Sequence, residues 1–151
     1  MGEHIYKSHN KTLLLYHLVF PAKYRRKVFS EQVEKTLKEV CFGMAKGYEI
    51  HFLEIGADED HVHFLVQSVP TVNVTSIVTK IKSITAREIF RKNPEVKKML
   101  WGGNFWTSGY YANTVGQYGN EAVIRNYVKN EGKKQYKQWH RDQPTLFEGL
   151  A

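Results

Sequence analysis

Apolar and polar residues alternate along the chain so that short strand-like runs are separated from longer helix-like runs. Four runs have the length and composition of β-strands: residues 13–20, 49–56, 61–69 and 105–115. Pro21 and Pro70 end the first and third runs, and a turn at residues 58–60 predicts that the second and third form a hairpin. Alternation within the second run places Ile50, Phe52 and Glu54 on one face.

Longer runs show apolar residues three and four positions apart, which is the spacing of an amphipathic helix. Ser30 is a suitable N-cap for the first of these helices, and Gly47 is its expected end. Asn93-Pro94 should end the second, and a short helical turn follows up to Leu100. The predicted helices cover residues 30–46, 73–92 and, near the end of the chain, 120–136.

The resulting order is βαββαβ followed by one more helix. It predicts an α+β protein of ferredoxin-like fold, with an antiparallel sheet, helices on one face and an extra C-terminal helix. We expect a single domain over residues 1–151, with an N-terminal arm at 1–11 and a C-terminal tail at 138–151. Many binders of single-stranded nucleic acids share this topology.

The charge of the chain indicates what kind of partner it binds. The 151 residues carry a net charge of +7, which favours a polyanion such as nucleic acid. Residues 47–79 contain no Lys or Arg but five acidic residues, so an acidic segment lies inside a basic protein. That contrast is typical of a solvated acidic face, or of a cation site surrounded by a phosphate-binding surface. No signal segment or membrane-spanning run is recognisable, so we expect a cytoplasmic protein.

His61-Val62-His63 is the first motif that indicates chemistry. Side chains two residues apart on a strand point to the same side, so both imidazoles can bind one divalent cation. The alternative is a pair of strand histidines without a ligand. Tyr127 and Glu131 are four residues apart and share a face of the last predicted helix. Tyr127 is a candidate nucleophile and Glu131 a candidate metal ligand, while the alternative for Tyr127 is a ring at the edge of the core.

Basic residues interleaved with aromatic ones indicate contact with a nucleic-acid strand, since cations bind phosphates and rings stack on unpaired bases. The candidate DNA-binding residues are Lys23, Arg25, Arg26, Lys27, Lys80, Lys82, Arg87, Trp106 and Tyr110. For the aromatic residues the alternative is burial in the core. The lone Cys41 is expected on the apolar face of a helix, and the chain has neither a GxxxxGK[ST] loop nor a GxSxG elbow.

Taken together, these residues resemble a known family over about residues 13–134. The matching segments are residues 16–26 (YHLVFPAKYRR), 60–63 (DHVH), 105–111 (FWTSGYY) and 127–129 (YVK). In this order they resemble the single-tyrosine HUH transposases of the insertion-sequence 200/605 group, where HUH stands for His-hydrophobe-His.

The resemblance implies a dimeric transposase that cuts and rejoins single-stranded DNA at hairpin-marked ends of a mobile element. It implies that Tyr127 is the nucleophile and forms a 5′-phosphotyrosine, and that His61 and His63 bind Mg²⁺ or Mn²⁺. The family's third protein ligand is usually a glutamine where this chain has Glu131. In the family each active site combines the histidines of one subunit with the tyrosine of the other.

Two other functions are compatible with parts of this pattern. A non-catalytic module that binds single-stranded nucleic acid would explain the charge and the aromatic residues, but not the histidine pair together with Tyr127. A rolling-circle-type nicking protein uses the same residue types, usually within longer chains.

Overall fold

The structure of the chain, a computed structural model, describes residues 3–100 and 103–115. Its strands are β1 (Ile5–Lys7), β2 (Asn10–Thr12), β3 (Leu14–Pro21), β4 (His51–Ala57), β5 (His61–Ser68) and β6 (Tyr111–Thr114). Its helices are α1 (Glu31–Tyr48), α2 (Val74–Lys92) and α3 (Glu95–Met99), with a short 3₁₀ turn, η1 (Lys23–Arg25), after β3. The predicted last helix and C-terminal tail lie outside the described residues.

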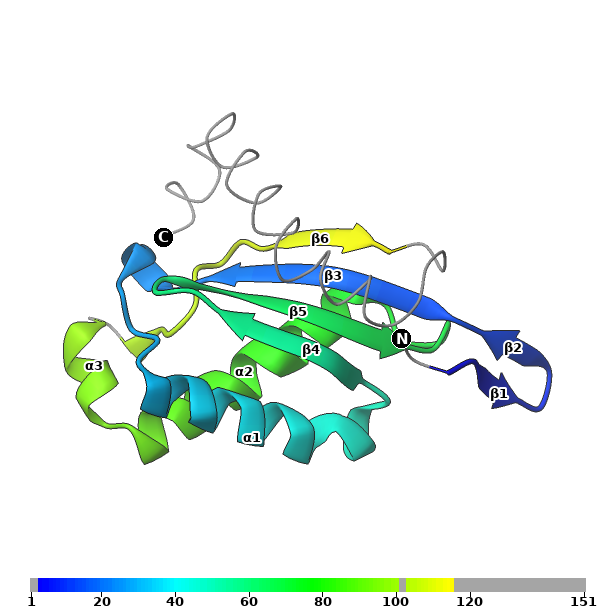
Figure 1. The fold of residues 1–151 in the computed structure, drawn as a ribbon, viewed down its shortest axis with the longest axis horizontal. Coiled ribbons are helices and arrows are strands. Elements are labelled where there is room, and N and C mark those ends of the chain that lie inside the picture. Colours follow the sequence, from blue (N-terminus) through cyan, green and yellow to red (C-terminus); the bar gives the residue numbers. More distant parts are fainter. Residues whose placement is uncertain (1–2, 101–102, 116–151) are drawn as a thin grey trace.

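The main sheet has the strand order β4-β5-β3-β6, and all of its pairs are antiparallel. Helices α1 and α2 cover one face of this sheet (Figure 1). The predicted α+β, ferredoxin-like arrangement of the βαββαβ unit is therefore confirmed. No helix among the described residues is long and apolar enough to cross a membrane.

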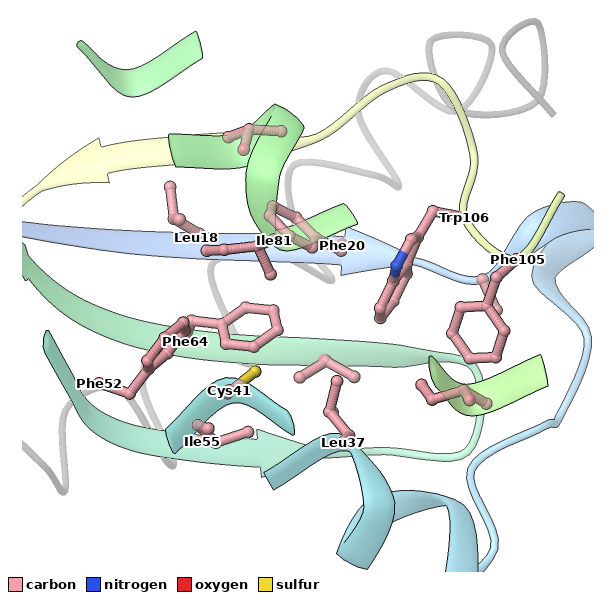
Figure 2. Close-up of a cluster of buried hydrophobic side chains, with 14 of the residues drawn as sticks. Leu18, Phe20, Leu37, Cys41, Phe52, Ile55, Phe64, Ile81, Phe105 and Trp106 are labelled. Atoms are coloured by element: carbon pink, nitrogen blue, oxygen red, sulfur yellow. The ribbon is translucent and has the colours of Figure 1, made fainter. Parts of the chain in front are cut away.

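The core fills the space between the sheet and the two helices (Figure 2). Leu18, Phe20 and Phe64 reach it from the central strands, and Leu37 and Ile81 reach it from α1 and α2. All five side chains are fully buried. Burial of this apolar surface is the main favourable contribution to folding, and it fixes which face of each strand points to the helices.

The two long helices begin where the sequence predicts. Ser30 Oγ accepts a hydrogen bond from the Val33 amide at 3.3 Å, and Asn73 Oδ1 accepts one from the Ser76 amide at 2.8 Å. Each cap satisfies an amide that the first turn leaves without an intrahelical partner. The first helix does not end at Gly47 but continues to Tyr48, and Glu49 follows in a left-handed conformation with φ 54°.

Two predictions about strands are wrong in detail. A bulge between Phe52 and Glu54 shifts the register of β4, so that Ile55 rather than Glu54 follows Phe52 into the core. The fourth strand covers only Tyr111–Thr114 instead of residues 105–115. Phe105 and Trp106 pack into the same core cluster although they are adjacent, whereas regular strand alternation would place them on opposite faces.

The N-terminal arm contains a structure that the sequence analysis did not predict. Strands β1 and β2 pair as a small antiparallel hairpin, which projects beyond the start of β3 (Figure 1). Gln67 Nε2 donates to the Glu3 carbonyl at 2.6 Å, and Lys7 pairs with Glu49 at 3.2 Å. These contacts connect the hairpin to the end of the sheet opposite η1.

Candidate metal centre

The histidine pair lies at the start of β5, directly after the turn that joins it to β4. Val62 and Phe64 point into the core, so alternation places His61 and His63 on the sheet face opposite α1 and α2. Their exposed fractions are 3% and 1%. The predicted common orientation of the two imidazoles is present, and Nε2 of His61 lies 3.1 Å from Nε2 of His63.

Asp58, the first residue of the turn, completes a three-residue cluster. Its Oδ2 lies 2.9 Å from His61 Nε2 and 3.8 Å from His63 Nε2. The backbone amide of Asp58 donates to the His61 carbonyl at 2.9 Å, which closes the turn and fixes the position of the carboxylate. The ligand atoms of Asp58, His61 and His63 all lie within 4.8 Å of one another.

This donor set fits a divalent cation. Neighbouring ligands in an octahedral shell with bonds of about 2.1 Å lie about 3 Å apart, which matches two of the three separations in the cluster. A carboxylate oxygen suits Mg²⁺ and Mn²⁺, and imidazole nitrogens favour Mn²⁺ of the two. Three electron-rich atoms converging at this distance repel one another unless a cation or a proton lies among them.

Asp60 contacts His61 on its Nδ1 side, and Arg25 contacts Asp60 in turn. Nδ1 of His61 lies 2.7 Å from Asp60 Oδ1, and Arg25 contacts the other oxygen of the same carboxylate. Burial raises the pKa of Asp60, but the hydrogen bond to His61 and the charge of Arg25 outweigh it, so the pKa lies below its usual value. The carboxylate therefore stays ionised at neutral pH and orients His61 with Nε2 toward Asp58.

The backbone after β3 aims Arg25 at this carboxylate. Tyr24 and Arg25 have φ values of 58° and 54°, a left-handed conformation that costs a non-glycine residue about 1–2 kcal/mol. Two hydrogen bonds flank the turn and hold it, from the Ala22 amide to the Asp60 carbonyl and from the Lys23 amide to the Phe105 carbonyl, both 2.8 Å. Strain that the surroundings maintain in this way is typical of functional sites.

His17, on the neighbouring strand β3, contacts the second histidine of the pair. Its Nε2 lies 3.3 Å from His63 Nδ1, and it is fully buried. Burial lowers the pKa of His17 to about 4, so its imidazole is neutral at neutral pH. Neither His17 nor Asp58 is predicted from the sequence as an individual site residue. His17 lies within the segment of the family resemblance, and Asp58 lies in the acidic turn.

The cluster opens to the surface beside the turn. A hollow of about 280 Å³ is lined by Asp58, Glu59, Asp60 and His61. The side chain of Asp58 is 28% exposed, in contrast to the two buried imidazoles. The cluster is therefore accessible to solvent from the side of the Asp58 carboxylate.

The predicted DNA-binding residues fall into different surroundings. Arg26, Lys27 and Arg87 are exposed, and Lys80 is half-buried, with its Nζ 5.1 Å from the centre of the Tyr48 ring. Lys23 and Lys82 line a hollow of about 420 Å³ between α2 and residues 103–108. Arg25 differs from its neighbours because its guanidinium is bound to Asp60.

Lys82 and Trp106 are more deeply integrated in the fold than the sequence suggests. Lys82 Nζ donates to the carbonyls of Thr107 and Gly109 at 2.8 and 2.9 Å, and it lies 5.6 Å from the centre of the half-buried Tyr110 ring. Trp106 is 5% exposed, and its indole N–H donates to Thr85 Oγ1 at 3.0 Å (Figure 2). In this conformation Trp106 is a core residue, and no base can stack on its ring.

The predicted nucleophile Tyr127 and ligand Glu131 lie outside the described residues.

Comparisons with known proteins find sequences and structures that are similar to this chain. The family described as "Transposase IS200 like" matches the chain over residues 10–131. The ISDra2 transposase TnpA of Deinococcus radiodurans is 31% identical over 122 residues, which are 81% of this chain and 86% of that protein. The transposase for insertion sequence element IS200 of Salmonella typhimurium is 28% identical over 131 residues, which are 87% and 85% of the two chains.

Solved structures share the fold. A crystal structure from Deinococcus radiodurans R1 superposes with a TM-score of 0.69 at 28% identity, over 83% of this chain and 96% of that one. The REP-associated tyrosine transposase, solved bound to a REP hairpin, superposes with a TM-score of 0.56 at 12% identity. The second match covers 89% of this chain and 74% of that one, and at this identity it supports the fold alone.

Proposed function

Because the chain belongs to the IS200-like transposase family, we propose that it cuts and rejoins single-stranded DNA at the ends of an insertion sequence. The observation that carries this proposal is the convergence of Asp58, His61 and His63 on one point at the end of the sheet. A carboxylate and two imidazoles in this arrangement suit a cation that acts on a phosphate.

In this proposal Asp58, His61 and His63 hold Mg²⁺ or Mn²⁺, and Glu131 adds a fourth protein ligand. The bound cation supplies charge neutralisation at the scissile phosphate. Asp60 keeps the proton of His61 on Nδ1, so that the lone pair of Nε2 can bind the cation, and Arg25 favours the ionised form of Asp60. The buried positions of the imidazoles limit the water that competes for the site.

Tyr127 is the proposed nucleophile. Its hydroxyl oxygen forms a bond to phosphorus, and the bond from phosphorus to the 3′ oxygen of the preceding nucleotide breaks. The tyrosine loses its proton, and the departing oxygen takes one up and becomes a free 3′-hydroxyl. The resulting 5′-phosphotyrosine conserves the energy of the phosphodiester, so rejoining requires no nucleotide cofactor.

The basic residues around the cluster provide affinity for the strand. Arg26 and Lys27 are exposed directly after Arg25 in the chain, and Lys27 pairs with Glu59, which lines the hollow beside Asp58. Lys23 lines the hollow beside α2. Contacts of this kind bind phosphates without reading the sequence. Since the REP-associated relative was solved with a hairpin, we propose that hairpins near the element ends direct this protein to its cleavage sites. The active form is proposed to be a homodimer whose sites are shared between subunits.

A covalent-adduct assay tests the proposal. The purified chain is mixed with single-stranded oligonucleotides from the DNA that flanks its gene, with Mn²⁺ or with EDTA. We expect a protein–DNA adduct that survives denaturing electrophoresis, and we expect it only with the metal. Tyr127→Phe removes only a hydroxyl and should abolish the adduct, while His61→Ala and His63→Ala should abolish cleavage and leave metal-free DNA binding near that of the unmodified protein.

The same assay distinguishes the alternatives. A non-catalytic single-strand binder would bind the oligonucleotide with or without Mn²⁺ and would form no adduct. A normal adduct yield in Tyr127→Phe would overturn the assignment of the nucleophile, and Tyr110 or Tyr111 would have to be tested next. Loss of DNA binding together with cleavage in the histidine variants would mean that the pair is structural.

A further inference from the structure

We propose that His17 is a positioning residue that keeps the proton of His63 on Nδ1 and so presents the Nε2 lone pair of His63 to the metal. This inference rests on the proposed function of the His61–His63 pair. His17 touches neither metal nor DNA in this role, because it acts through His63.

The strand register explains how these two residues meet. In the pairing of β3 with β5, His17 lies opposite Leu65, and Val19 lies opposite His63. His17 is therefore the diagonal neighbour of His63 on the same face of the sheet, within reach of an aromatic side chain. Both imidazoles are buried, with exposed fractions of 0% and 1%.

The ring geometry indicates a directed hydrogen bond rather than a stacking contact. The planes of the two rings differ by 11°, and their centres are 5.6 Å apart, while Nε2 of His17 and Nδ1 of His63 are 3.3 Å apart. The separation of the centres exceeds the N–N distance by roughly twice the distance from an imidazole centre to its nitrogen. Both nitrogens therefore lie on the line between the centres, so an N–H on one ring points at the lone pair of the other.

Only one proton fits between these nitrogens, and the other side of His63 decides where it belongs. Nε2 of His63 faces His61 Nε2 at 3.1 Å and Asp58 Oδ2 at 3.8 Å, so a proton on Nε2 would occupy the position of the cation. When Nδ1 carries the proton, it donates to Nε2 of His17, and His17 keeps its own proton on Nδ1. The rings of Tyr111 and His17 pack edge-to-face with their centres 5.8 Å apart, and this contact limits the rotation of His17.

The two ligating histidines thus have different partners at Nδ1. His61 has the carboxylate of Asp60, and His63 has a neutral imidazole. A neutral acceptor fixes the tautomer without adding a second negative charge beside the phosphate. Partners of this kind usually change metal affinity 10- to 100-fold.

Two substitutions separate this role from simple packing. His17→Phe keeps a ring of similar size but removes the acceptor, whereas His17→Gln places an acceptor oxygen near the position of Nε2. Leu15→Val shortens a buried side chain on the same face of β3 and serves as the control for altered packing. The first measurement is the tautomer of His63 in the metal-free, ¹⁵N-labelled protein by NMR, and the second is the affinity for Mn²⁺ by calorimetry.

We expect the Nδ1–H tautomer of His63 in the unmodified protein, in His17→Gln and in Leu15→Val, and a mixture with Nε2–H in His17→Phe. Mn²⁺ affinity should fall about 10- to 100-fold in His17→Phe and recover at least in part in His17→Gln. An Nε2–H tautomer in the unmodified protein, or unchanged tautomer and affinity in His17→Phe, would overturn the proposal. An Nε2–H tautomer in the unmodified protein overturns the proposal even when a variant does not fold.

These readouts also keep the two proposals apart. If the unmodified protein binds no Mn²⁺, the proposed function fails, while the NMR measurement still reports on His17. If it binds Mn²⁺ and forms the adduct, and His17→Phe changes neither tautomer nor affinity, only the role of His17 fails.

Discussion

Arg25 holds Asp60 through two nitrogens that converge on one carboxylate oxygen. Nε and Nη2 of Arg25 lie 3.1 and 2.9 Å from Asp60 Oδ2, and the other oxygen, Oδ1, faces His61 Nδ1. A continuous chain of polar contacts therefore links the guanidinium of Arg25 to His61 and so to the cluster of candidate metal ligands. The basic segment at residues 23–27, which the sequence presents as one cluster of cations, contains members with different roles.

The first prediction separates Arg25 from its neighbour Lys27. Arg25→Gln removes the charge that favours the ionised form of Asp60 and orients its carboxylate, so Mn²⁺ affinity should fall about tenfold. DNA binding in EDTA should change little, because Arg25 is already paired within the protein. Calorimetry with Mn²⁺ and titrations of a single-stranded oligonucleotide at several salt concentrations measure the two effects.

Lys27→Gln is the matched control. The Lys27 side chain is 76% exposed and, within the part of the chain that the structure describes, pairs with the similarly exposed Glu59. Its loss should weaken DNA binding and reduce the salt dependence by about one unit of slope, with Mn²⁺ affinity unchanged. A variant Arg25→Gln that loses DNA binding and keeps its Mn²⁺ affinity would make Arg25 a phosphate contact after all.

The second prediction concerns the carboxylate of the cluster. Asp58→Asn keeps the shape of the side chain but removes the negative charge that faces both imidazoles, so Mn²⁺ affinity should fall at least about tenfold. Glu59→Gln removes a charge one residue away on a side chain that is 75% exposed and paired with Lys27, and it should change the affinity much less than Asp58→Asn. If the two variants bind Mn²⁺ equally well, Asp58 is not a ligand.

The helices and central strands were predictable because local pattern and tertiary packing agree there. The N-caps Ser30 and Asn73 and the alternation of β5 need only neighbouring residues to be recognised. The bulge after Phe52 was not predictable in this way, since one inserted residue changes faces without changing composition. The loop at residues 105–109 was not predictable from local sequence either, because its position depends on hydrogen bonds from Lys82 on α2.

The residues of the candidate site also differ in whether local sequence is enough to predict them. His61 and His63 follow from alternation within one strand, so the sequence places them together. His17 is 46 residues away from His63 in the chain, and only the register of β3 against β5 makes them neighbours. Asp58 depends on how the turn folds back on His61, and acidic turn residues are usually only solvated. Contacts of this kind require the three-dimensional structure.

The third prediction follows from the buried amine of Lys82. Burial lowers the pKa of Lys82 to about 8 from its usual value of 10.5. Between these two pH values the unfolded chain binds a proton that the folded chain has released, so this residue makes stability rise with pH in that window. Below about pH 8 both states are protonated, and the contribution no longer changes.

Urea unfolding of the unmodified protein and of Lys82→Met from pH 7 to 10.5 measures this contribution. The unmodified protein should gain stability relative to the variant as the pH rises from about 8. The neutral amine keeps N–H groups for the carbonyls of Thr107 and Gly109, so the loop should stay in place. A relative loss of stability over the same range would show that the two carbonyls favour the charged form more than burial opposes it.

The last prediction tests whether the proposed dimer shares its active sites. A His63→Ala chain is mixed with a Tyr127→Phe chain under conditions that allow dimers to exchange subunits, and each chain alone is inactive. If sites are shared, one site of each mixed dimer combines the intact histidines of the Tyr127→Phe chain with the intact Tyr127 of the other chain. Activity should then return, and the DNA should be attached only to the His63→Ala chain, which a size tag identifies.

The matched control is a mixture of His61→Ala with His63→Ala chains. Neither chain carries an intact pair, and both imidazoles belong to the same cluster, so no activity should return in any arrangement of subunits. Cross-linking of differently tagged chains verifies that mixed dimers form in both experiments. If mixed dimers of the His63→Ala and Tyr127→Phe chains form and stay inactive, each site is built within one subunit, because every such site then contains one defective residue.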